Sequence, residues 1–159
     1  MLIRNILEES VRKFDEVKAV KWLKKKEIME RSYGELMENV VSTRKGLLAE
    51  GFEGKHIALI GTSSVEWMES YLGIITGCTT AVPLDAALPC EDLIDLLNRS
   101  DSAALFLSPK LKPYLDAFLE NCPKLQKVWM LQEEVEDAPA KVYGIGELRN
   151  AGKSASADS

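Results

Sequence analysis

Hydrophobic and polar positions between residues 32 and 131 follow two different periods in turn. Apolar residues recur every three or four positions in four segments, which predicts four helices. These segments are 36–48, 65–75, 93–97 and 111–119. Short apolar runs typical of strands alternate with them. These runs are 57–60, 79–84, 103–107 and 128–131. Helix and strand joined in alternation by short links predict an α/β fold, with a largely parallel sheet and helices on both faces.

Serine and glycine residues mark where some of these helices begin and end. Ser32 and Glu35 match a capping box, in which each side chain hydrogen-bonds the other residue's backbone amide. Gly51 is placed to end that helix in a left-handed conformation. Ser63 and Glu66 match a second capping box before the next helix. That next helix is apolar on nearly all sides, so we expect it to be packed on most of its surface.

Residues before this core predict a helix followed by a β-hairpin. Apolar residues at helical spacing in 3–14 predict an amphipathic helix. Residues 17–23 and 28–31 predict two strands, with a charged turn between them that we interpret as solvated.

Residues after the core change in character. Four acidic residues and Pro139 predict a linker, residues 146–150 predict one helical turn, and residues 154–159 predict a mobile polar tail. The chain therefore divides into three predicted parts. These are an amino-terminal helix and hairpin at 1–31, an α/β core at 32–132, and an acidic linker with a flexible tail at 133–159.

The composition narrows the class of protein further. Of 159 residues, 46% are hydrophobic and 28% are charged, which is typical of a globular domain and excludes global disorder. With 20 basic and 25 acidic residues the formal charge is −5, which argues against binding to nucleic acid. No apolar run approaches the roughly 20 residues that span a membrane, and no signal peptide is visible. We expect a soluble, cytoplasmic domain.

The cysteines and the histidine do not predict a metal site or a catalytic centre. Cys78, Cys90 and Cys122 are odd in number and lack a Cys-x-x-Cys spacing, which fits neither a disulfide framework nor a zinc site. We interpret them as buried, unreactive thiols. His56 has no cysteine or second histidine near it and no nucleophile motif to serve, so we interpret it as structural.

The strongest local candidate for a site is Gly61-Thr62-Ser63-Ser64, between a predicted strand and a predicted helix. Hydroxyl residues at a helix start can bind an anion, because free backbone amides and the helix dipole point toward it. The stretch matches neither the three-glycine dinucleotide motif nor the Gly-Lys-Ser/Thr phosphate loop. A helix cap alone also explains these residues, and both interpretations stay open.

Other residues give weaker indications. Asp85 follows a predicted strand, at the end of a parallel sheet where ligands commonly bind. The other acidic residues and the lysine that a receiver domain needs are not in place around it. Glu91 and Asp92 fall in the first turn of a predicted helix, where negative charge is favourable without any catalytic role. The tryptophans are assigned to the core. We predict no catalytic, cofactor-binding or metal-binding residue in this chain.

An ordered series of short motifs gives the chain a resemblance to a known family. The motifs are Ser-Tyr-Gly-Glu-Leu at 32–36, Gly-Lys-His-Ile-Ala-Leu at 54–59, Glu-Trp at 66–67, Leu-Gly-Ile at 72–74 and Val-Pro-Leu at 82–84. The series resembles the amino-terminal part of the adenylate-forming (AMP-binding) enzymes: acyl-CoA synthetases, luciferase relatives and the adenylation domains of peptide synthetases. The resemblance covers about residues 5–131.

The chain departs from the family pattern at three places. Ser32 replaces the usual threonine, which preserves a helix cap. Lys55-His56 replaces the common Asp-Arg and changes the charge of that turn. Thr62-Ser63-Ser64 stands where the family commonly has asparagine before Glu-Trp, so no role is carried over to that loop.

The family's catalytic motifs are missing from this sequence. It contains no Ser/Thr-Gly-Thr-Thr-Gly-x-Pro-Lys-Gly phosphate loop, no adenine motif, no ribose-binding aspartate and no carboxy-terminal catalytic lysine. The resemblance therefore implies an amino-terminal fragment of a longer ligase, with the long-chain fatty acid–CoA ligases as the preferred branch. Its implied partners are the carboxy-terminal parts of that parent and a fatty acid or other carboxylate substrate.

The reaction that the resemblance implies for the parent has two steps and uses ATP, Mg²⁺ and coenzyme A. A carboxylate attacks the α-phosphate of ATP, and the coenzyme A thiol then displaces AMP. Alone, we expect the chain to be inactive and to self-associate through apolar surface. One alternative is a free-standing, non-catalytic interaction or regulatory α/β domain. Another is a small-ligand binder that uses the helix start at Gly61-Thr62-Ser63-Ser64.

Overall fold

The computed structural model describes residues 18–24, 27–62, 64–132, 134–136 and 138–154. The predicted helix at 3–14 lies outside these residues. The elements are β1 (Lys18–Lys24), β2 (Glu27–Ser32), α2 (Tyr33–Ala49), β3 (His56–Ile60), α3 (Val65–Ile75), β4 (Thr80–Leu84), α4 (Cys90–Arg99), β5 (Ser102–Leu107), the 3₁₀ helix η1 (Pro109–Tyr114), α5 (Leu115–Asn121), β6 (Lys127–Met130), β7 (Val142–Gly144) and α6 (Ile145–Ser154). Strands β1 and β2 pair antiparallel, so the predicted hairpin is confirmed.

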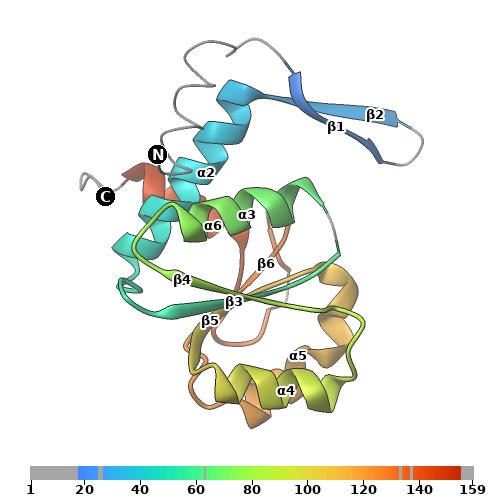
Figure 1. Ribbon diagram of the computed structural model, residues 1–159, viewed down its shortest axis with the longest axis vertical. Coiled ribbons are helices and arrows are strands. Elements are labelled where there is room, and N and C mark those ends of the chain that lie inside the picture. The colour runs from blue at the N-terminus through green and yellow to red at the C-terminus, as the bar shows by residue number, and fades with distance from the viewer. Residues whose placement is uncertain (1–17, 25–26, 63, 133, 137, 155–159) are drawn as a thin grey trace.

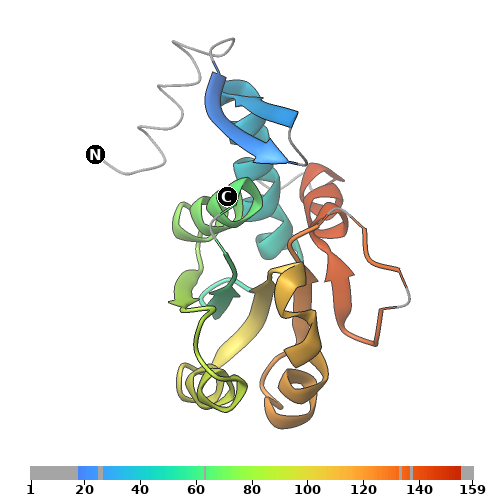
Figure 2. The ribbon, with the colours of Figure 1, turned by 90° about the vertical axis from the view of Figure 1, so that its right-hand side faces the viewer.

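A five-stranded sheet forms the centre of the molecule. Its strand order is β4-β3-β5-β6-β7, and every neighbouring pair is parallel. Helices α2, α3 and α6 cover one face and helices α4 and α5 cover the other (Figure 1, Figure 2). The predicted fold class, a largely parallel sheet with helices on both faces, is therefore confirmed.

Successive side chains of the strands point to opposite faces and fill two separate cores. The core under α4 and α5 takes alternate residues of three strands: Ala58, Ile60, Leu105, Leu107, Val128 and Met130. The core under α2, α3 and α6 takes the residues between them: Ile57, Leu59, Ala104, Phe106 and Trp129. Because both faces are covered, these strands appear in the sequence as unbroken apolar runs.

Helix α2 begins and ends as its sequence predicts. The Glu35 backbone N–H donates to Ser32 Oγ (3.2 Å), and the Ser32 N–H donates to Glu35 Oε1 (3.3 Å), which completes the capping box. Gly51 has φ +84°, and the Phe52 N–H donates to the Leu47 carbonyl at 3.0 Å. A left-handed glycine after the last turn lets the chain reverse without a Cβ clash.

The cap of helix α3 lies one residue later than predicted. It is Ser64, whose Oγ accepts the Trp67 backbone N–H at 3.0 Å. The predicted capping box of Ser63 with Glu66 is therefore wrong. Adjacent serines offer the same hydroxyl chemistry, and with Ser64 as the cap Val65 becomes the first helical residue and is buried.

The prediction that α3 is packed on most of its surface is confirmed. None of its residues is exposed, and Met68, Tyr71 and Leu72 are half-buried. The buried carboxylate of Glu69 contacts Asn39 of α2 and Arg149 of α6. The Ser70 hydroxyl is buried with no hydrogen-bond partner among the described residues.

Polar groups hold α2, α3 and α6 together. The Asn39 side-chain amide of α2 donates to Glu69 Oε2 of α3 at 2.9 Å. Arg149 of α6 donates through Nε to Thr43 Oγ1 (3.3 Å), and its Nη2 lies 3.5 Å from Glu69 Oε1. The Arg149 and Glu69 side chains are 5% and 0% exposed, so this is a buried ion pair with hydrogen-bond support.

Glycines bring α6 against α2 at close range. A Cβ on Gly152 would lie 2.1 Å from the Ser42 carbonyl oxygen, and a Cβ on Gly46 would lie 2.3 Å from the Leu148 carbonyl oxygen. Both obstacles are backbone atoms and cannot rotate away. The contact therefore requires glycine at both positions.

The carboxy-terminal part is more ordered than predicted. Residues 146–150 were predicted to form one helical turn after a linker, but β7 is the fifth strand of the sheet and α6 extends over ten residues. Ile145, Leu148 and Arg149 are buried in α6. The prediction of a single turn is wrong because this helix carries few apolar residues and is stabilised by packing on α2.

The predicted helix at 111–119 is two elements. A 3₁₀ helix, η1, contains Pro113 and precedes the short helix α5. Proline lacks a backbone N–H and disfavours α-helical geometry in the residue before it. The α-helix accordingly begins only after Pro113, at Leu115.

Candidate functional site

The strand order places a crevice at the carboxyl ends of the strands. Strand β4 lies on one side of β3, and the next strand, β5, lies on the other side. The chain therefore runs in one direction along the sheet from β3 to β4 and in the opposite direction from β4 to β5. In open α/β sheets, ligands bind in the crevice at such a reversal. A cavity of about 650 Å³ occupies this place, lined by the segments that follow β3, β4 and β5.

The first wall of the crevice is the loop between β3 and α3. Gly61 and Thr62 line the cavity. A Cβ on Gly61 would lie 3.0 Å from Ser108 Cβ, so the glycine allows the ends of β3 and β5 to approach each other. Ser64 belongs to the helix cap, and Ser63 lies outside the described residues. Gly61 and Thr62 of the predicted anion-binding stretch therefore reach the crevice.

The second wall follows β4. Asp85 lines the cavity, and its carboxylate accepts the Ala87 backbone N–H at 2.9 Å. This bond turns the chain after the strand, so the carboxylate has a structural task and also places a negative charge at the rim. The structure thus brings together Asp85 and the Gly61-Thr62 loop, which were separate candidates in the sequence.

The third wall is η1, which the sequence did not indicate. Lys110, Leu111 and Tyr114 line the cavity, and Lys110 is exposed with no ion pair among the described residues. Their position follows from β5 lying beside β3, and no local sequence signal reports strand order. The crevice therefore offers one ammonium, one carboxylate, a threonine hydroxyl and an apolar wall.

The other candidate residues lie outside the crevice. Glu91 and Asp92 are exposed in the first turn of α4. Cys122 is buried, and burial raises the pKa of its thiol, with Cys90 adding a smaller effect. Burial and then the neighbouring Glu91 raise the pKa of Cys90, whereas Cys78 is exposed, so the prediction that all three thiols are buried is wrong for Cys78. His56 lies at the amino ends of the strands, on the side of the sheet opposite the crevice.

Within the described part of the chain, no group of three or more histidine, cysteine, aspartate or glutamate side chains is arranged to hold a metal ion. None of the helices in that part is both long and apolar enough to cross a membrane.

Comparison with known protein families identifies the chain. A family model described as "AMP-binding enzyme" matches residues 7–156, which is nearly the whole sequence. The chain belongs to the AMP-binding enzyme family. The family resemblance seen in the motif series is thereby confirmed. No curated protein sequence matches the chain.

Solved structures of this family share the fold. Coronafacic acid ligase from Pectobacterium brasiliense superposes with a TM-score of 0.83 at 20% identity, over 94% of this chain and 29% of that one. Anthranilate CoA ligase AuaEII, solved with anthranoyl-AMP, gives 0.79 at 17% identity, over 92% and 27%. A protein from Rhodopseudomonas palustris named long-chain-fatty-acid CoA ligase gives 0.77 at 11% identity, over 93% and 36%.

These figures limit the likeness to the fold. Each identity is too low to transfer a substrate, and the AMP-binding chain described here spans only 27% to 36% of the length of these structures. Ligase neighbours nevertheless agree with membership of an adenylate-forming family, which uses ATP and Mg²⁺.

Proposed function

We propose that this chain is the amino-terminal scaffold of an ATP-dependent acyl-CoA ligase. The observation that carries the proposal is the family match over residues 7–156, together with superposition on ligases that extend well beyond the matched region. The crevice at the strand reversal supports it, because it lies where α/β sheets bind their ligands.

The proposed reaction joins a carboxylic acid to a thiol in two steps. The carboxylate oxygen attacks the α-phosphorus of ATP and pyrophosphate leaves, giving an acyl-adenylate. The coenzyme A sulfur then attacks the acyl carbon and AMP leaves. Both steps build negative charge on phosphate or carbonyl oxygens, which such enzymes stabilise with positioned cationic groups and amides.

The chain alone is proposed to be inactive. It contains no glycine- and threonine-rich phosphate loop and no carboxy-terminal catalytic lysine, which the family uses for that stabilisation. In the crevice, Lys110 is the one basic side chain that lines the cavity, and Asp85 faces the same space. One exposed ammonium beside a carboxylate offers little net charge for a triphosphate.

A fatty acid is the proposed carboxylate, and the cytoplasm the proposed compartment. Support for the fatty acid comes from the motif series and from the name of the Rhodopseudomonas palustris neighbour. The enzyme encoded by the complete reading frame that contains this chain should release pyrophosphate in the presence of ATP and a fatty acid. Release with anthranilate and not with any fatty acid would contradict the substrate class.

A free-standing regulatory domain is the second candidate, because one observation favours it. The five-stranded sheet is covered on both faces by helices of this same chain, so its core is complete. The downstream coding sequence separates the two candidates. An open frame that continues into a phosphate loop supports the ligase, and a stop codon after Ser159 supports the free-standing domain.

Self-association is proposed for the isolated chain. Met68, Tyr71 and Leu72 form a half-buried apolar surface on α3, and none of these three side chains is charged. Light scattering at millimolar concentration should detect dimers or larger species, and Met68→Glu should reduce them. A strictly monomeric chain at that concentration would contradict this proposal.

A further inference from the structure

A second cavity lies at the amino ends of the central strands, opposite the crevice at their carboxyl ends. It has a volume of about 520 Å³ and is lined by the residues that begin β3 and by the turns that precede β5 and β6. Its charged and polar side chains are Lys55, His56, Asp101, Lys124 and Gln126. None of them takes part in the crevice, so a ligand role for this second cavity is independent of the proposed ligase function.

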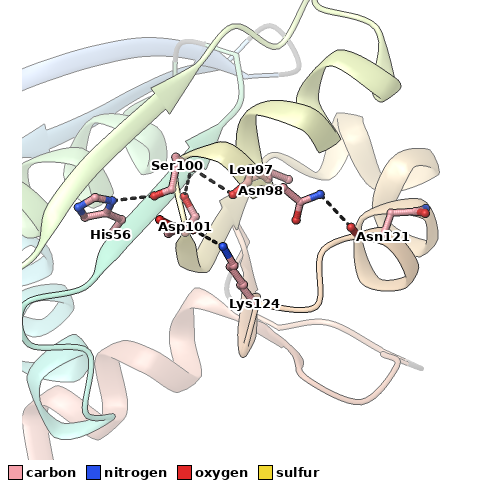
Figure 3. A network of polar contacts seen from close by, with 8 residues as sticks. His56, Leu97, Asn98, Ser100, Asp101, Asn121 and Lys124 are labelled. Carbon is pink, nitrogen blue, oxygen red and sulfur yellow. Dashed lines mark hydrogen bonds and ion pairs between the residues drawn. The ribbon is translucent and has the colours of Figure 1, made fainter.

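The imidazole of His56 is held in a fixed orientation. Its Nδ1 lies 2.7 Å from the Ser100 carbonyl oxygen, and a carbonyl only accepts hydrogen bonds, so Nδ1 carries the proton (Figure 3). The Ser100 hydroxyl in turn contacts Leu97 and Ser102, which fixes the turn itself. The other ring nitrogen, Nε2, points away from Ser100 (Figure 3). The His56 side chain makes no other hydrogen bond or ion pair among the described residues, so Nε2 is open to a ligand.

The charge of the cavity is positive. Lys124 and Asp101 form an ion pair across it and largely cancel each other. Lys55 forms no ion pair and no side-chain hydrogen bond among the described residues. The titratable or charged groups that line the cavity around His56 are thus Lys55 next to it in the chain, Asp101 before β5 and Lys124 before β6. Lys55 leaves one net positive charge at this cavity.

Lys55 gives this cavity a positive charge, although the chain as a whole has a formal charge of −5. A lysine without a protein partner is a point charge available to an anion, and lysine is a common phosphate-binding residue. Gln126 adds a side-chain amide donor at the same cavity.

We propose that this cavity binds a phosphate group, as free phosphate or as a small phosphate monoester. Lys55 supplies the positive charge that attracts the anion, His56 lines the same cavity with Nε2 open to a ligand, and Gln126 supplies a neutral donor. The cavity volume lies within the usual range of about 300 to 1,000 Å³ for small-molecule sites, which leaves space for the body of an ester.

The test is a titration of the isotope-labelled chain followed by nuclear magnetic resonance. Inorganic phosphate, glycerol 3-phosphate and uncharged glycerol are added separately at constant ionic strength. Both phosphates should shift the His56 imidazole and the Lys55 and Gln126 amides, with saturation at millimolar concentration, and glycerol should shift nothing. If glycerol 3-phosphate binds more tightly than phosphate, the ester is the natural ligand class; the reverse order assigns free phosphate.

Matched variants make the test specific. Lys55→Gln and His56→Gln should each weaken binding by about two- to fivefold, as expected for exposed charged contacts. Lys112→Gln, an exposed lysine on η1, should change nothing. If His56→Gln disturbs the fold, Lys55→Gln still decides, because the described residues show no side-chain bond that it would break. The proposal is overturned if the shifts grow linearly without saturation, if they fall at Thr62 and Lys110, or if Lys55→Gln leaves affinity unchanged.

Discussion

The two faces of the sheet are built on different principles. Under α4 and α5 the contacts are almost wholly apolar, with Leu93, Leu97 and Phe118 fully buried. Under α2, α3 and α6 an apolar core also exists, but above it the helices meet through a buried ion pair and two glycine contacts. One face is held mainly by apolar area, with one hydrogen bond from Asn98 of α4 to the Asn121 carbonyl of α5, whereas the other adds buried contacts that only particular residues can make.

This contrast indicates how each face tolerates change. Apolar cores accept hydrophobic replacements of similar volume with modest losses. A buried ion pair and a backbone contact at a glycine do not, because a partial replacement leaves an unpaired charge or an atomic overlap. Helix α6 should therefore depend on a few specific residues, and α4 and α5 on total buried area.

The greatest loss of stability should come from truncating a ring on the apolar face. Phe118→Ala should lower the free energy of unfolding by about 4 kcal/mol, since it removes a fully buried ring and leaves a cavity. Asp116→Ala, at an exposed position of the same helix, is the control and should change little. Urea unfolding measures both. A loss below about 1 kcal/mol for Phe118→Ala would show that this face is loosely packed.

A single methyl group should disrupt the other face. Gly152→Ala places a Cβ 2.1 Å from the Ser42 carbonyl oxygen, so α6 must separate from α2. We expect a loss of about 3 kcal/mol or more, at or above the usual range for overpacking. Asn150→Ala on the exposed side of α6 should be nearly neutral. Hydrogen exchange of the α6 amides should rise in the first variant only, and unchanged protection there would contradict the glycine contact.

The buried ion pair should show strong coupling between its partners. Glu69→Leu leaves Arg149 buried without its carboxylate and should destabilise the chain by about 3 kcal/mol. The double variant Glu69→Leu with Arg149→Leu should recover most of that loss. The exposed pair of Lys153 with Glu38 provides the control, and Glu38→Gln should change stability by less than about 0.5 kcal/mol. Additive losses at Glu69 and Arg149 would refute the coupling.

A much weaker effect, which depends on pH, is expected at an exposed ion pair. A hydrogen bond from Lys124 and its positive charge lower the pKa of Asp101 below its ordinary value of 3.8. A lowered folded-state pKa stabilises the fold above the unfolded pKa, and the contribution disappears as pH falls through the folded one. Asp101→Asn suits the left-handed backbone at this position (φ 54°) and removes the charge. The variant should be slightly less stable than wild type at pH 7, and the difference should shrink as pH falls through the folded-state pKa of Asp101. A difference that does not shrink on acidification would exclude the charge as its cause.

Local patterns predicted most of the fold because they act over a few residues. The capping box of Ser32 with Glu35 and the apolar run at 57–60 each depend on near neighbours, and both were correct. Strand β7 has only three residues, and α6 carries few apolar residues, so neither produced a long apolar pattern in the sequence. The burial of Glu69 was likewise invisible, because its partner Arg149 lies 80 positions away along the chain.

The candidate site was predicted only in part, for a similar reason. Asp85 and Thr62 were noticed because each follows a predicted strand. Lys110 and Tyr114 reach the same crevice because β5 lies next to β3, and strand order is a long-range property.

Isotope exchange between pyrophosphate and ATP decides whether this chain is a scaffold without chemistry of its own. The purified chain is incubated with ATP, Mg²⁺ and fatty acids, beside the enzyme encoded by its complete reading frame. We predict exchange above background only for the longer enzyme, because this chain positions the sheet and its crevice without a phosphate loop. Fatty-acid-dependent exchange by the isolated chain would show that the scaffold role is wrong.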